Sequence, residues 1–108
     1  MIADLETMEK EIALRLRELK PAKVILFGSY AYGAPDKESD IDICIIKNVP
    51  TYSVRSYNLQ ARRLLRDLIF KYKIGFDIIT VPETLIQKRE DPFYREDILT
   101  KGKVIYAE

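Results

Sequence analysis

Two short runs dominated by aliphatic residues constrain the fold of this chain most strongly. Residues 23–27 read KVILF, and residues 41–46 read IDICII. Runs of this length and composition predict β-strands, and the first of them has no polar position between its ends. We therefore expect it to be buried on both faces, in a sheet that other elements must cover.

The rest of the chain alternates between helical and extended patterns. Apolar residues recur every three or four positions in the first twenty residues, which predicts an amphipathic helix that Pro21 ends. Gly75 is expected to mark the end of a second, longer helix. The remaining predicted elements are that helix at 53–72, a strand at 76–81 stopped by Pro82, helical stretches at 84–89 and 93–100, and a last strand at 104–106.

Length and composition limit the class of protein. At 108 residues, the chain is expected to form one domain, 1–108. The absence of histidine excludes His-based zinc sites and Ser-His triads, and the single Cys44 excludes an internal disulfide. Because the N-terminal segment is charged throughout, we expect neither a signal peptide nor a membrane span, and hence a cytoplasmic protein.

Three carboxylates stand out within the predicted strands. Asp40 and Asp42 lie two positions apart, so they share one face of the strand while the alternating isoleucines point to the other. Asp77 is the one charged residue of the FDIITV strand, and it would join them if the two strands are neighbours. Carboxylates held this close repel each other, so the pattern indicates a bound cation, and oxygen ligands favour Mg²⁺ or Mn²⁺.

A Gly-Ser pair follows the first strand directly. Gly28 would let the chain turn sharply with its backbone close to a ligand, and Ser29 could cap a short helical turn after it. Exposed N–H groups and a hydroxyl at such a turn suit a phosphate. Ser39 could also line this site, although a solvated loop position is at least as consistent with the sequence.

Taken together, these residues resemble a known signature. Gly28-Ser29, ten intervening residues, Asp40-Ile41-Asp42 and a later Asp77 look like the motif of the DNA polymerase beta nucleotidyltransferase superfamily. The length of the chain is similar to that of its minimal nucleotidyltransferases. The resemblance covers almost the whole chain and implies an α+β fold with a small mixed β-sheet flanked by helices. Tyr32 departs from the pattern, because relatives often have a basic residue there.

The resemblance also implies a mechanism. Asp40 and Asp42 would bridge two Mg²⁺ ions, and Asp77 would bind the ion nearest the attacking hydroxyl and receive its proton. Gly28 and Ser29 would hold the β- and γ-phosphates of ATP. In-line attack on the α-phosphorus would then release pyrophosphate.

The acceptor of the nucleotide cannot be read from these residues. Stand-alone minimal nucleotidyltransferases typically act as the antitoxin of a HEPN toxin-antitoxin pair, which implies transfer of AMP to a tyrosine of a HEPN-family RNase toxin. Two alternatives stay open: a non-catalytic antitoxin that binds its toxin, and transfer to a small molecule or RNA. With 18 basic and 17 acidic residues, direct nucleic-acid binding is not expected.

Other candidate residues have simpler explanations. Cys44 shares a face with the aspartates by alternation, but we expect it to act as a small hydrophobic residue. Basic residues gather on the predicted long helix, where a solvated helix face is favoured over a surface for triphosphate or RNA. These residues are Arg62, Arg63, Arg66, Lys71 and Lys73.

Overall fold

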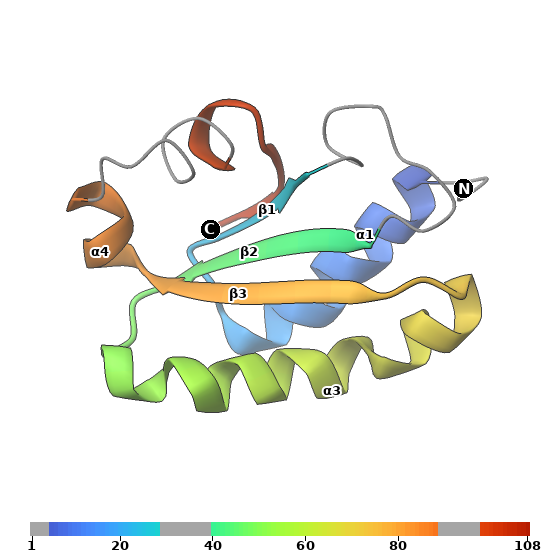
Figure 1. Cartoon of the computed structure of the whole chain (residues 1–108), viewed down its shortest axis with the longest axis horizontal. Coiled ribbons are helices and arrows are strands. Elements are labelled where there is room, and N and C mark those ends of the chain that lie inside the picture. Colours follow the sequence, from blue (N-terminus) through green and yellow to red (C-terminus); the bar gives the residue numbers. More distant parts are fainter. Residues whose placement is uncertain (1–4, 29–39, 89–97) are drawn as a thin grey trace.

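The structure is a computed structural model that describes residues 5–28, 40–88 and 98–108. Within these residues it contains one sheet, with helices α1 and α3 against the same face (Figure 1). The helices are α1 (Leu5–Leu16), α3 (Val54–Tyr72) and α4 (Glu83–Lys88), with single 3-10 turns at Arg17–Leu19 and Thr51–Ser53. The strands are β1 (Lys23–Phe27), β2 (Ile41–Lys47), β3 (Phe76–Pro82) and β4 (Lys103–Ala107).

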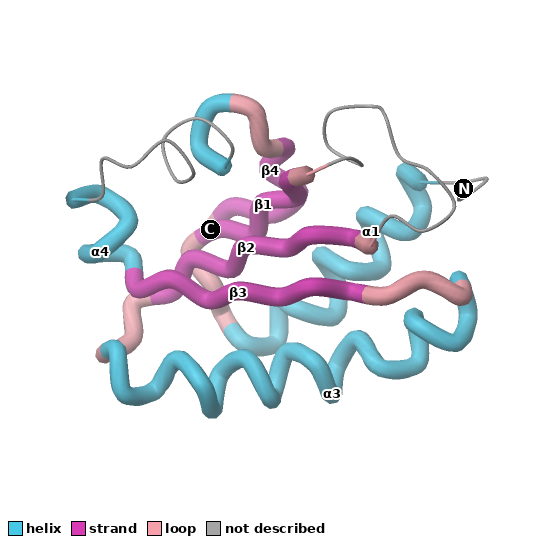
Figure 2. The backbone as a smooth tube through the Cα atoms, in the orientation of Figure 1, coloured by secondary structure: helices cyan, strands magenta, loops and turns pink. Residues whose placement is uncertain are grey.

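The sheet is mixed, as the resemblance implied. Its strand order is β3-β2-β1-β4, with β1 antiparallel to both β2 and β4, and β2 parallel to β3 (Figure 2). The parallel pair requires a crossover, which α3 provides. The α+β fold class is therefore confirmed. Strand β2 lies between β1 and β3, and the candidate site residues are found at one end of these three strands.

The alternation of side chains along β2 divides the core into two parts. Ile41, Ile43 and Ile45 belong to the larger cluster, which packs against α1 and α3. Cys44 and Ile46 point to the opposite face, into a smaller cluster completed by α4 and the segment after residue 97. Both faces of the central strands are thus covered, which explains why the KVILF run has no polar interior position.

The strand expected at 76–81 and the helix expected at 53–72 can be compared with the structure at their ends. Pro82 was expected to stop its strand, but β3 includes it. In the described part of the sheet β3 is an edge strand, and proline is tolerated in edge strands because one side of such a strand makes no hydrogen bonds within the sheet. The long helix ends at Tyr72, as predicted; Lys73 follows it in a left-handed conformation (φ 54°), and the Lys73 N–H donates to the Ile69 carbonyl.

Parts of other predictions fall outside the described residues. The helical stretch expected at 93–100 is described only from residue 98, where a short helical turn is present. The first four residues of the N-terminal helix lie outside the described ranges too. Among the helices that the structure describes, none combines the length and the apolar character needed to cross a membrane.

Candidate active site

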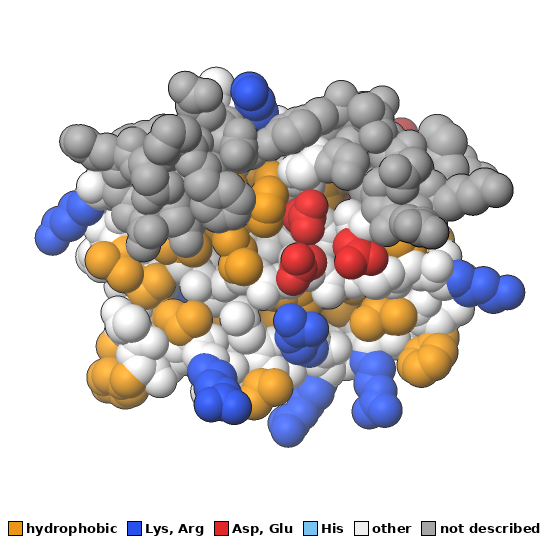
Figure 3. Space-filling model, viewed as in Figure 1, with side chains coloured by type: hydrophobic (Ala, Val, Ile, Leu, Met, Phe, Trp, Pro, Cys, Tyr) orange, Lys and Arg blue, Asp and Glu red, His pale blue; other side chains and the backbone are white. Residues whose placement is uncertain are grey.

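The three predicted carboxylates are placed on neighbouring strands. Asp40 immediately precedes β2, Asp42 is the second residue of β2, and Asp77 is the second residue of β3. The parallel register pairs Asp42 directly with Asp77, and paired residues of neighbouring strands point to the same face. That face is opposite to α1 and α3, and Figure 3 shows acidic side chains grouped on it.

The electrostatics of Asp42 reflect this arrangement. Its pKa is raised above the ordinary value, first by partial burial and then by repulsion from Asp77 and from Asp40. Asp40 and Asp77 themselves are exposed. The folded chain therefore holds like charges close enough to interact, which is unfavourable unless a cation shares the site.

Gly28 makes room for the Asp42 carboxylate. The glycine follows β1 directly and has a φ of +76°, a conformation that favours glycine. A Cβ at this position would lie 2.0 Å from Oδ2 of Asp42. The glycine is thus needed both for the turn and for the space in which the carboxylate lies, a contact that sequence reasoning did not anticipate.

Gly75 plays a similar part for Asp40. A Cβ here would lie 2.7 Å from Oδ1 of Asp40, although the backbone of Gly75 is not left-handed. The Gly75 carbonyl also accepts a 2.9 Å hydrogen bond from the N–H of Ile41, at the start of β2. Sequence reasoning interpreted Gly75 only as a helix end. Its position could have been found from the strand register, because pairing Asp42 with Asp77 aligns Asp40 with Gly75.

The side chains of Asp40, Asp42 and Asp77 are suitable ligands for a hard divalent ion, because all three offer carboxylate oxygens. As placed, however, no group of three or more His, Cys, Asp or Glu among the described residues could hold a metal ion. Ser29 and Ser39, the predicted phosphate-binding and site-lining residues, lie outside the described residues, as does Tyr32. The predicted roles of these residues and of Asp40, Asp42, Asp77 and Gly28 stay predictions.

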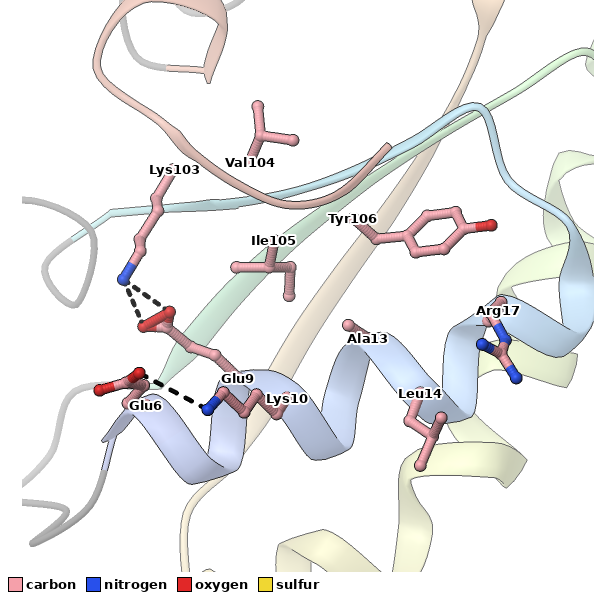
Figure 4. A pocket seen from close by; sticks show the side chains of 10 residues that line it. All are labelled: Glu6, Glu9, Lys10, Ala13, Leu14, Arg17, Lys103, Val104, Ile105 and Tyr106. Carbon is pink, nitrogen blue, oxygen red and sulfur yellow. Dashed lines mark hydrogen bonds and ion pairs between the residues drawn. The ribbon is translucent and has the colours of Figure 1, made fainter. Parts of the chain in front are cut away.

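Other hollows lie away from the carboxylates. The one in Figure 4, with a volume of about 430 Å³, lies between α1 and β4. In the described sheet, β4 is at the opposite edge from β3, the strand that carries Asp77. Lys103 reaches across it and pairs with the buried Glu9 at 2.7 Å. None of Gly28, Asp40, Asp42 and Asp77, the predicted site residues that the structure describes, lines this hollow.

Comparison with known proteins identifies the family. The sequence profile of the family described as Nucleotidyltransferase domain matches residues 9–105. This chain belongs to that family. The match spans β1, β2, β3, the first three residues of β4 and the three carboxylates, so the enzyme class implied by the Gly-Ser and Asp-x-Asp pattern is confirmed at the level of nucleotidyl transfer.

Individual proteins similar to this chain carry a more specific name than the family. Two proteins of Methanocaldococcus jannaschii, named "Putative protein adenylyltransferase MJ0604" and "Putative protein adenylyltransferase MJ0141", are similar to this chain. The first is 36% identical over 78% of this chain and 77% of the relative. The second is 34% identical over 76% of each.

Solved structures share the fold. The crystal structure of a mutant of the toxin-antitoxin pair MntA-HpeT matches with a TM-score of 0.61 and 21% identity, over 93% of this chain and 73% of that chain. In that mutant, two aspartates two positions apart are replaced by glutamates. A toxin-antitoxin structure with AMP-PNP matches with the same TM-score, identity and coverage.

Proposed function

We propose that this chain is a Mg²⁺-dependent protein adenylyltransferase that moves AMP from ATP to a tyrosine of a HEPN-family RNase toxin, and so acts as its antitoxin. The observation that carries the proposal is the pairing of Asp42 with Asp77 across β2 and β3, next to the Gly28 turn. Nucleotidyl transfer requires carboxylates beside a turn that binds phosphate, and here the carboxylates and the Gly28 turn are found at the same end of the sheet.

The acceptor class is supported by similarity. The curated relatives carry the name of protein adenylyltransferases, and the structural neighbours are toxin-antitoxin complexes, one of them with an ATP analogue. The two aspartates that are replaced in one neighbour have the same spacing as Asp40 and Asp42 in this chain.

In the proposed reaction, the tyrosine hydroxyl oxygen attacks the α-phosphorus of ATP. The new O–P bond forms as the bond between the α-phosphorus and the bridging oxygen breaks, and pyrophosphate leaves with that electron pair. Asp77 is exposed on the open face of β3, so its carboxylate can reach the hydroxyl and accept its proton. The turn at Gly28 and Ser29 would hold the β- and γ-phosphates, which leaves the α-phosphorus accessible.

Asp40, Asp42 and Asp77 would hold the two Mg²⁺ ions expected for this family. The ions, when bound, neutralise the triphosphate and lower the pKa of the attacking hydroxyl. Binding would also relieve the repulsion that raises the pKa of Asp42. Because no complete ligand group is preformed among the described side chains, we expect the carboxylates to rotate when a cation binds.

The direct test uses the product of the gene next to the one for this chain, which we expect to be a HEPN-domain protein. We expect incubation with ATP and Mg²⁺ to add AMP to one of its tyrosines, detected by mass spectrometry of the intact protein and its peptides. Asp77→Ala should lower the rate at least about 10²-fold, the usual scale for loss of a proton acceptor. Asp42→Ala removes a proposed metal ligand and should also abolish most transfer, while circular dichroism stays unchanged in both variants. Glu18→Gln, an exposed carboxylate outside the site, is the matched control.

Two results would contradict the proposal. Neutralisation of the toxin with no change in its mass would indicate an antitoxin that acts by binding alone. Equal transfer by wild type and by both aspartate variants would show that these carboxylates do not carry the chemistry.

A further inference from the structure

A groove with a volume of about 260 Å³ runs between α3 and the edge strand β3. Its floor is apolar and is formed by the buried side chains of Leu65, Phe76 and Ile78. On α3, Leu59 and Ile69 continue the apolar lining and are 49% and 36% exposed. The groove therefore offers accessible apolar surface beside the strand that carries Asp77.

The rim of the groove is strongly basic. Arg62, Arg63 and Arg66 line it, all three are exposed, and no acidic residue is among the described residues that line it. Figure 3 shows basic side chains along α3, below the acidic group on the sheet. Since the whole chain has a net charge of only +1, this positive surface is a local feature.

These arginines differ from the other cations between α1 and α3. Arg15 pairs with Asp67, and Lys71 donates a 2.7 Å hydrogen bond to Glu11, so both are used to hold the two helices together. Among the described residues, no ion pair satisfies Arg62, Arg63 or Arg66. They are therefore available to a partner with carboxylates.

The groove and the candidate proton acceptor share one strand. Phe76 and Ile78 line the groove, and Asp77 lies between them in sequence with its side chain on the other face of β3. In the described part of the sheet, β3 pairs only with β2, so its outer edge is open. A segment lying along that edge would place alternate side chains toward the groove and toward Asp77.

Resting on the proposed function, we propose that this groove docks the acceptor protein through an acidic segment with apolar anchors. Carboxylates of the segment would meet Arg62, Arg63 and Arg66, and apolar side chains would cover Leu59 and Ile69. A tyrosine in the same segment would then face the Asp77 side of the strand. Acidic residues flanking the acceptor tyrosine are the predicted specificity signal.

The test measures binding and transfer separately, with random copolymers as probes. Fluorescence anisotropy should show that the full chain binds labelled poly(Glu,Tyr) but not poly(Lys,Tyr), more weakly as salt increases. Arg62→Glu with Arg66→Glu should weaken binding at least about 10-fold, the effect of 1.4 kcal/mol. Arg17→Glu with Lys101→Glu changes the net charge equally at exposed positions outside the groove, and should leave affinity within about twofold, a margin well under 1.4 kcal/mol.

A parallel assay follows AMP incorporation into the copolymer from labelled ATP. The groove variant should raise the KM for poly(Glu,Tyr) and leave the KM for ATP unchanged. Absence of transfer by wild type, with binding intact, would count against the proposed function and leave the groove assignment standing. The groove assignment is overturned if both double variants bind alike, if the groove variant loses ATP affinity instead, or if a single-stranded RNA oligonucleotide depends on the groove arginines while poly(Glu,Tyr) does not.

Discussion

At the scale of single residues, the Asp42 carboxylate contacts or interacts with more of the described site residues than any other side chain discussed above. It lies against Gly28, faces Asp77 across the strand pair and has a raised pKa because of burial and repulsion. A carboxyl group whose pKa is higher in the folded than in the unfolded chain binds protons more readily when folded. Its contribution to stability is therefore lost as the pH rises from near 3.8, the ordinary value, through the raised pKa.

Asp77→Asn should remove part of the repulsion that makes the charged form of Asp42 unfavourable in the folded chain. We expect the metal-free variant to match wild type in acid, where Asp42 is protonated, and to become more stable than wild type toward neutral pH, by up to about 1 kcal/mol for partly exposed charges. Urea denaturation at several pH values measures this difference. Glu18→Gln should show no such gain, and a large loss of stability in Asp77→Asn at neutral pH would mean that Asp77 is structural.

The two glycines beside the carboxylates predict different outcomes on substitution. Gly28→Ala places a Cβ into a left-handed turn and 2.0 Å from Oδ2 of Asp42, so we expect a loss of about 1–2 kcal/mol in unfolding free energy together with loss of transfer. Gly75→Ala has no such backbone strain and meets only the mobile end of Asp40, at 2.7 Å. It should cost less than about 1 kcal/mol but still weaken Mg²⁺ binding, because the Asp40 carboxylate is displaced.

Denaturation curves and Mg²⁺ titrations of both variants distinguish these effects. Wild-type Mg²⁺ affinity in a folded Gly75→Ala variant would show that Gly75 does not position Asp40.

At the scale of elements, the strand pattern predicted most of the sheet. KVILF forms β1 with the predicted bounds, and β2 extends the predicted strand by one residue, because apolar runs and strict alternation are local signals. The inclusion of Pro82 in β3 and the position of Gly75 beside Asp40 were missed for a different reason. Whether a proline is tolerated depends on its strand being at the sheet edge, and the role of Gly75 depends on Asp40, which is distant in sequence.

The middle of β2 allows a test of the prediction that Cys44 has no chemistry. Its side chain is fully buried in the smaller core cluster, and burial raises the pKa of the thiol to about 12. A thiol this far from ionisation should not react with a thiol reagent at neutral pH until the chain unfolds. Labelling in buffer and in denaturant, followed by mass spectrometry, measures this; rapid labelling of the native protein would contradict the assigned burial.

At the scale of the whole molecule, the sequence predicted the carboxylate cluster better than its partners. Asp40, Asp42 and Asp77 could be located because strand alternation and one correct neighbour relation bring them together. The arginine-rimmed groove could not be distinguished from a solvated helix face, since its apolar floor comes from β3 and its basic rim from α3. The proposed acceptor is a separate molecule, so its identity could not be predicted from local patterns of this chain.

The most direct measurement is the change in melting temperature on adding Mg²⁺ with a non-hydrolysable ATP analogue. For wild type we expect a rise equivalent to about 2.7 kcal/mol when the ligand is at 100 times its Kd. Asp40→Asn, Asp42→Asn and Asp77→Asn should each lose most of the Mg²⁺-dependent part of this rise, while Glu18→Gln keeps it. An unchanged Mg²⁺-dependent rise in all three aspartate variants would contradict a divalent-ion site on these carboxylates.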